Sequence, residues 1–223
     1  MPQISISLGE AASADQVAPA LKILLLLTIL ALAPAILISM TSFTRIVIVL
    51  SFVRQAIGSQ NLPPTQVVMA LSLLLTSVVM TPVAQHINSD VLEPYQHKQL
   101  DEAQAMSKAS IILGGFLIPQ TRQSDLTMFY ELSKTPPPKD TADVSLHLLV
   151  PAFMISELRT GFEMGFLIFL PFVLIDLIVA SILTAMGMVM LPPTMLATPL
   201  KLLLFVVVDG WAVLSRSLVA SFG

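Results

Sequence analysis

The sequence predicts an all-α, membrane-associated protein, and three observations carry that prediction. Apolar residues make up 55% of the 223 residues, charged residues only 11%, and the mean hydropathy is +0.86, whereas about a quarter of an average soluble domain is charged. Residues 23–44, 55–89 and 177–200 contain no Asp, Glu, Lys or Arg. Each of these stretches is long enough to cross about 30 Å of hydrocarbon as a helix. No convincing strand alternation appears along the chain.

The pattern of polarity divides the chain into four parts. We expect a polar N-terminal leader (1–20), a first helical hairpin region (21–89), a hydrophilic helical insert (90–145) and a second helical hairpin region with a Met-rich loop (146–223). The leader does not have the charge order of a secretory signal, because Glu10 and Asp15 precede the first basic residue of the chain, Lys22. We therefore expect the apolar helix that follows the leader to remain in the mature protein.

The first hairpin region contains two apolar segments, residues 22–53 and 64–87. The polar sequence TSFTR (41–45) is expected to divide the first segment. Pro64 is suited to the start of a helix, where the missing N–H of proline is not needed. Pro82 is expected to bend the second helix.

The insert, residues 90–145, holds eight acidic residues and five Lys or Arg. Apolar side chains recur at helical spacing in residues 126–130, behind a candidate cap at Ser124-Asp125, and the three prolines at 136–138 end the pattern. Arg45 and Arg54 flank the short connection between the first two apolar segments, which favours a cytoplasmic connection and a periplasmic insert.

The second hairpin region begins with an apolar segment, residues 146–191, that is too long for one span. We expect Pro151, Gly161 and Pro171 to interrupt it. A further apolar segment, residues 199–222, is expected to return as the second arm of the hairpin.

Three methionines, Met186, Met188 and Met190, alternate directly before Pro192-Pro193. A helix cannot simply continue through the two prolines, because each lacks an N–H donor and restricts the residue before it. Methionine adapts its shape to what it contacts, which suits a deformable lining or seal. The spacing alone fits gap-filling methionines of a core at least as well.

Seven ionisable residues lie within or beside the apolar segments, and each would cost at least about 2.5–3.5 kcal/mol facing lipid. They are Arg45, Glu157, Arg159, Glu163, Asp176, Lys201 and Asp209. So many buried charges favour a tightly packed assembly in which helices touch protein. Arg159 and Glu163 are spaced to pair along one helix.

Three of the other ionisable residues need more distant partners. Glu157 and Lys201 have no partner within one turn, which indicates long-range or intersubunit pairs. Asp176 is expected to make a buried structural hydrogen bond, with proton transfer as the alternative.

Catalytic and metal-binding patterns are missing from the sequence. The three histidines show no metal-ligand spacing, the chain has no cysteine, and no nucleophile elbow, phosphate loop or dinucleotide fingerprint occurs. We expect neither an enzyme nor a cofactor or metal site. A net charge of −3 without a basic run argues against nucleic acid as a partner.

Five segments carry a resemblance to a known family: PAILISMTSFTRIVIVLSFVRQAIG (34–58), LPPTQVVMALSLLLT (62–76), LLVPAFMISELRTGFEMGFLIFLPFVLIDLIVAS (148–181), MGMVMLPP (186–193) and TPLKLLLFVVVDGW (198–211). On these segments the chain closely resembles the FliP family of flagellar biosynthetic proteins, whose relatives also occur in virulence type III secretion systems. They cover most of the chain outside the N-terminus and the insert.

The resemblance implies a core component of the flagellar type III protein export gate. Such proteins form bent helical hairpins packed in a ring-like helical homo-oligomer, expected to be a pentamer, with FliQ-like and FliR-like proteins and further export-apparatus subunits. The gate lies in the bacterial inner membrane at the flagellar basal body and passes unfolded flagellar proteins.

The resemblance also assigns roles to individual residues. It implies that Met186, Met188 and Met190 form the pore gasket, with Val189 where many relatives have another methionine. It further implies that Glu157 and Lys201 bridge neighbouring copies. Two other functions stay open, a structural scaffold that does not line the pore and a proton or small-solute transporter that uses Asp176.

Overall fold

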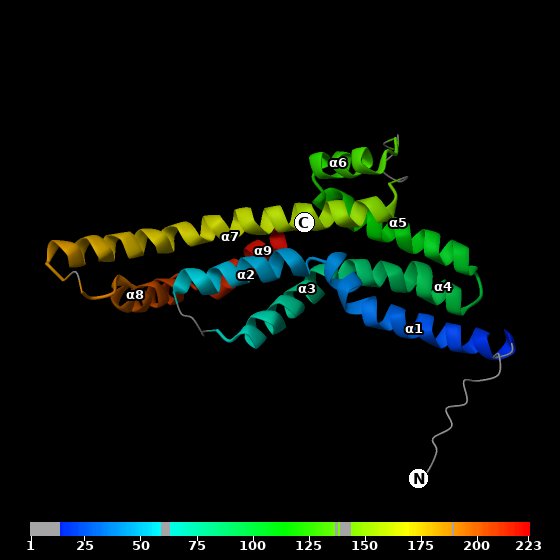
Figure 1. Cartoon of the computed structure of the whole chain (residues 1–223), viewed down its shortest axis with the longest axis horizontal. Helices are drawn as coiled ribbons and strands as arrows, with labels where there is room; N and C mark the ends of the chain where they lie inside the picture. The colour runs from blue at the N-terminus through cyan, green and yellow to red at the C-terminus, as the bar shows by residue number, and fades with distance from the viewer. Residues whose placement is uncertain (1–13, 59–62, 137, 139–143, 189) are drawn as a thin grey trace, which may run out of the picture. The chain divides into compact units, whose positions relative to one another are not determined.

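The computed structural model describes residues 14–58, 63–136, 138, 144–188 and 190–223. All regular secondary structure in these ranges is helical, which confirms the all-α prediction (Figure 1). The elements are α1 (Ala14–Ser39), α2 (Phe43–Ile57), α3 (Thr65–Ile87), a π-helical turn (Asn88–Leu92), α4 (Glu93–Gln96), α5 (Glu102–Gln120), α6 (Gln123–Ser133), α7 (Leu146–Ala185), α8 (Pro193–Val207) and α9 (Gly210–Ala220).

The chain divides into two compact units, residues 1–37 and residues 38–223. The first unit holds most of α1, whose described side chains between Leu21 and Ile36 are apolar and exposed almost without exception. Helix α1 ends at Ser39 and α2 begins at Phe43. The break therefore falls at the polar segment where the sequence predicts it.

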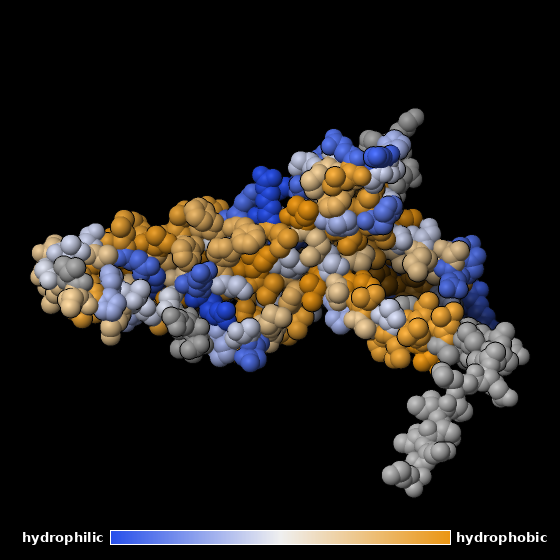
Figure 2. Space-filling model, viewed as in Figure 1, coloured by the Kyte–Doolittle hydropathy of each residue, from blue (hydrophilic) through white to orange (hydrophobic). Residues whose placement is uncertain are grey.

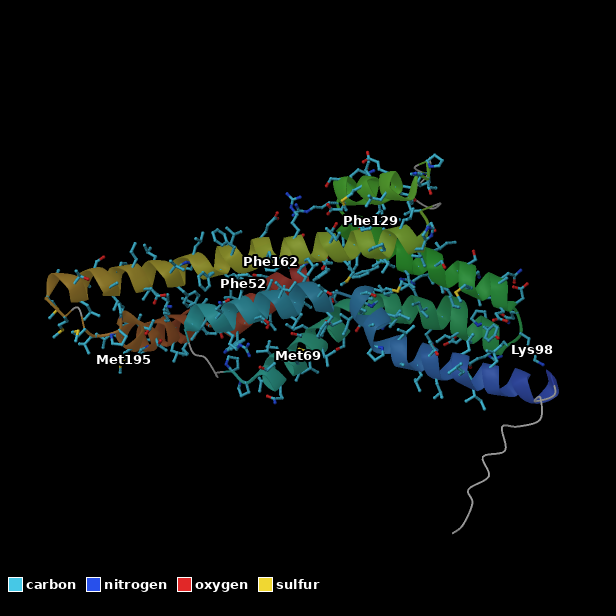
Figure 3. All side chains as sticks on the ribbon, in the orientation of Figure 1. Phe52, Met69, Lys98, Phe129, Phe162 and Met195 are labelled. Atoms are coloured by element: carbon cyan, nitrogen blue, oxygen red, sulfur yellow. The ribbon has the colours of Figure 1, made fainter. Side chains whose placement is uncertain are left out.

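The core of the second unit forms where α2 packs along α7. Ile46, Val49 and Val53 of α2 are fully buried. Glycines of α7 allow the close approach, since a Cβ atom placed on Gly165 would lie only 2.6 Å from the ring of Phe52. Phe52 also meets Phe162 of α7 edge to face, with ring centroids 5.6 Å apart (Figure 3).

Helix α7 runs for 40 residues without a break, with Pro151 and Pro171 inside it. The prediction that prolines and Gly161 interrupt this segment is wrong. A proline inside a helix costs about 3 kcal/mol, but α7 packs against α2, α5, α6 and α8 along its length. Burial against four helices outweighs this local penalty.

Within the described residues, two helical segments are long and apolar enough to cross a membrane, Thr65–Gln96 and Leu146–Ala185. Helices α8 and α9 give a third candidate only as a single broken span, since they are bent by 64° at residues 208–209. Large apolar side chains remain exposed along α7 and α8, and apolar residues dominate their visible surface (Figure 2).

The insert contains α5 and α6, as the sequence predicts, but α6 begins differently. Its cap is Arg122, and Ser124-Asp125 lie inside the first turn. The carboxylate of Asp125 instead accepts a hydrogen bond of 2.7 Å from Ser156 of α7. Together with the buried cluster of Leu117, Leu126 and Phe153, this contact fixes the insert on the first half of α7.

Candidate functional site

The methionine loop, residues 186–192, connects α7 to α8, and its first end is tightly fixed. Gly187 adopts a left-handed conformation with φ of 76°. Its N–H donates to Thr184 O (3.0 Å), and the N–H of Met188 donates to Leu183 O (2.9 Å). These two bonds form a Schellman motif, which ends a helix at a glycine because the left-handed conformation strains other residues.

The two prolines fix the second end of the loop. Pro192 is the N-cap of α8 and Pro193 its first residue, the position where the fixed φ of proline suits a helix. The N–H of Met195 in the first turn donates to Pro192 O (3.1 Å). The predicted helix break is therefore confirmed.

The loop methionines are exposed in this chain. The exposed fraction of the residue is 65% for Met186, 43% for Met188 and 97% for Met190. None of the three fills a gap in a core, so the core interpretation does not describe them. Val189 lies outside the described residues.

Helices α7 and α8 form a hairpin behind the loop, closed by apolar contacts and one ion pair. Val179 and Leu183 of α7 pack against Ala197 of α8. One turn further from the loop, Lys201 Nζ lies 2.6 Å from Asp176 Oδ2, and Lys201 is buried. Asp176 thus accepts a hydrogen bond from Lys201, but its side chain is 36% exposed and not buried as the sequence predicts.

The ammonium group of Lys201 also lies close to Gly58. This residue caps the C-terminus of α2 with φ of 80°. A Cβ atom there would lie 3.6 Å from Lys201 Nζ, so the ammonium group faces the carbonyl end of α2 as well as Asp176. A cation at a helix C-terminus is favoured by the helix dipole.

Arg45 is the centre of a second network, in which Arg45 and Glu157 are buried and their other partners are half-buried. Its Nε donates to Glu157 Oε2 (2.9 Å), and its Nη2 donates both to Glu157 Oε1 and to Gln120 Oε1 (3.0 Å). Its Nη1 donates to the backbone oxygen (2.9 Å) and hydroxyl oxygen (3.0 Å) of Ser221. A guanidinium group has five N–H donors, and these five bonds use all of them.

The end of the chain closes over this network. The Arg45 guanidinium lies 3.8 Å from the centre of the Phe222 ring. Gln120 Nε2 donates to Phe222 O (3.2 Å), and Phe222 stacks on Phe116 of α5. Sequence reasoning missed Gln120, Ser221 and Phe222, because neither spacing nor composition distinguishes them from ordinary residues.

Glu157 and Lys201 are not brought together within this chain. Each already has an opposite charge, Arg45 for Glu157 and Asp176 for Lys201. The intersubunit bridge between them stays a prediction. The predicted pair Arg159–Glu163 is confirmed at 3.2 Å, and Arg122 of the insert joins it at 2.6 Å.

Asp209 stands at the bend between α8 and α9. Its backbone is left-handed, with φ of 52° and ψ of 49°, and its side chain does not cap α9. It is exposed between Val208 and Gly210, in contrast to the buried position that the sequence predicts, because the bend turns it outward. Gly210 has no room for a side chain, because a Cβ atom would overlap the ring of Phe205. Among the described residues, no group of three or more His, Asp or Glu side chains is placed to hold a metal ion.

Comparison with known proteins shows the family to which this sequence belongs. The sequence model of the FliP family matches residues 26–218. The "Flagellar biosynthetic protein FliP" of Bacillus subtilis is 46% identical over 217 residues, covering 97% of this chain and 98% of the relative. The protein of the same name from Aquifex aeolicus is 42% identical, covering 100% of this chain and 92% of its own. The chain therefore belongs to the FliP family of flagellar biosynthetic proteins.

Proposed function

We propose that this chain is a core subunit of the flagellar protein export gate in the bacterial inner membrane, and that its methionine loop seals the path of unfolded flagellar proteins. The observation that carries the proposal is the loop itself: three exposed thioether side chains between two rigidly fixed helix ends. Family membership supports a role in flagellar biosynthesis.

The physical argument for a seal rests on the properties of methionine. Flexible thioethers pack against surfaces of many shapes, and a hydrophobic constriction blocks water and ions by excluding them. When loops from several copies meet, their methionines close the path. A passing polypeptide displaces them, and they close again around any sequence.

The proposed assembly is a ring of copies of this chain with FliQ-like and FliR-like partners, with the insert on the periplasmic side. A bridge from Glu157 of one copy to Lys201 of the next would require both residues to leave or share their present partners. Glu157 is fully buried in the single chain, so such a bridge would have to form during assembly.

The seal is tested by replacing Met186, Met188 and Met190 together with alanine. Alanine removes the flexible side chains that fill the path, so we expect the closed gate to conduct ions. The measurement is ion conductance across membranes that contain the assembled export apparatus. Replacement by leucine, which keeps the apolar volume, is the matched control and should conduct far less than the alanine variant. Unchanged conductance in the alanine variant, with normal assembly, would remove the seal.

A further inference from the structure

The chain concentrates its methionines at one end of the α7–α8 hairpin. Four of its 12 methionines fall within residues 186–195. Met195 lies in the first turn of α8, next to the loop (Figure 3), and is 68% exposed. We call Met186, Met188, Met190 and Met195 the methionine tip.

Exposure decides which methionines meet a dissolved oxidant. All four residues of the methionine tip are exposed. Met40, Met80, Met154 and Met164 are half-buried, and the sulfur of Met154 already accepts a hydrogen bond from Thr44 (3.7 Å). Met69 and Met128 are exposed as well, at 39% and 36%, but each is less exposed than any methionine of the tip. Met106 of α5 is as exposed as Met195, at 68%, but belongs to the insert.

We propose that the methionine tip is an oxidation site, at which hydrogen peroxide converts the thioethers to sulfoxides and makes the closed gate permeable. This inference rests on the sealing function proposed above and adds a chemical regulation of the same residues. A seal between two aqueous spaces presents its outer surfaces to water, so dissolved peroxide reaches it.

The chemical step is a two-electron oxidation of sulfur. The lone pair of Sδ attacks one oxygen of hydrogen peroxide, an S–O bond forms and the O–O bond breaks. The departing hydroxide takes the remaining proton and leaves as water, so one sulfoxide and one water result from each peroxide. The product is polar and strongly hydrogen-bonding where the thioether was apolar.

The effect on a seal follows from this change of polarity. A hydrophobic constriction stays dry because its walls offer water no hydrogen bonds. Sulfoxide oxygens accept hydrogen bonds from water, so an oxidised tip becomes wet and conducts ions. The fixed ends of the loop, at Gly187 and Pro192, hold the oxidised side chains in the path.

The test uses the assembled export apparatus in sealed membrane vesicles, treated with hydrogen peroxide. Peptide mass spectrometry measures sulfoxide at each methionine, and ion conductance measures the seal. We expect sulfoxide at the methionine tip and a several-fold rise in conductance, reversed by methionine sulfoxide reductase. A variant with all four tip methionines replaced by leucine should show no rise, because leucine is apolar and not oxidised.

Met106→Leu is the matched control, since it removes an equally exposed methionine away from the loop and should leave the rise unchanged. An equal rise in the leucine-tip variant overturns the proposal, as does a tip that stays unoxidised or is oxidised without a rise. The triple alanine variant separates the two hypotheses: if it conducts without peroxide while oxidation has no effect, the seal stands and only the oxidation site fails.

Discussion

At Arg45 the five N–H donors of one side chain meet three separate parts of the chain: Glu157 of α7, Gln120 at the end of α5, and Ser221 near the C-terminus. A buried ion pair adds little net stability over a well-packed apolar contact, but removing one partner leaves an uncompensated buried charge. Arg45 is therefore required for the arrangement that the structure shows, because each of its five N–H groups donates a hydrogen bond that holds these parts together.

Replacing Arg45 with alanine should destabilise the fold strongly. Glu157 would be left fully buried without a counter-charge, a loss of about 3–5 kcal/mol. The measurement is the unfolding midpoint of the purified protein in detergent. Arg54→Ala is the control on the same helix, since the hydrogen bond of Arg54 to Thr65 is exposed, and a surface change of this kind stays within about 0.5 kcal/mol. Equal midpoints for the two variants would contradict the role of Arg45.

Charge reversal distinguishes the pair within the chain from the proposed bridge between chains. Glu157→Lys places a second cation against Arg45, so it should lower both stability and assembly. Adding Arg45→Glu should restore part of the stability of the single chain, since the bonds from Arg45 to Gln120 and Ser221 stay lost. Adding Lys201→Glu removes the pair with Asp176, so it should restore assembly only if Glu157 and Lys201 meet between copies. The measurements are the unfolding midpoint and the yield of assembled complex. If Arg45→Glu does not raise the unfolding midpoint of the Glu157→Lys variant, the Arg45–Glu157 ion pair does not determine the stability of the single chain.

Helices α2 and α7 are held close by glycine. Gly161 lies tightly against Ile48, and Gly165 faces Phe52 with no space for a Cβ atom. The prolines of α7 explain why sequence reasoning failed for this element. Their effect on a helix is local and visible in the sequence, whereas the packing that overrides it comes from residues about a hundred positions away. The short loop was easier, because Pro192 and Pro193 act locally, although the helix end at Gly187 was not predicted.

Gly165→Ala should destabilise the α2–α7 contact by about 1–3 kcal/mol, because the added methyl group meets the base of the Phe52 side chain, which cannot turn away. A second change, Phe52→Ala, should recover part of the loss by removing the clash. Gly115→Ala is the control, since a Cβ there has no neighbour within 4 Å and alanine favours a helix by up to about 1 kcal/mol. Unfolding in detergent measures all three variants, and a neutral Gly165→Ala would refute the close contact.

For the whole molecule, the exposed apolar surface is as informative as the core. Large apolar side chains of α7, among them Phe166, Leu170 and Leu174, face outward, and those of α8 do the same (Figure 2). Contiguous apolar surface of this extent marks contact with lipid or with other proteins. We therefore expect lipid or other proteins to cover these surfaces of α7 and α8. This agrees with the two described segments that are long and apolar enough to span a membrane.

The sequence predicted the helical class, the breaks at residues 41–45 and 192–193, and the Arg159–Glu163 pair, because each depends on neighbours in the chain. It did not reveal that Arg45 binds Glu157, 112 positions away, or that Lys201 binds Asp176. Those pairs depend on which helices lie side by side. Charge alone showed that partners must exist, and only the fold showed which ones.

The most direct test of the central claim is a crosslink from the methionine loop to a protein in transit. Met188→Cys introduces a cysteine into a chain that has none, and the export substrate is stalled in the assembled apparatus in membranes. A cysteine at Met106, exposed but in the insert, is the control. We predict a crosslink between position 188 and the substrate and none from position 106. Intact secretion with no crosslink at position 188 would contradict a place for the loop on the path, and would favour a scaffold role for this chain.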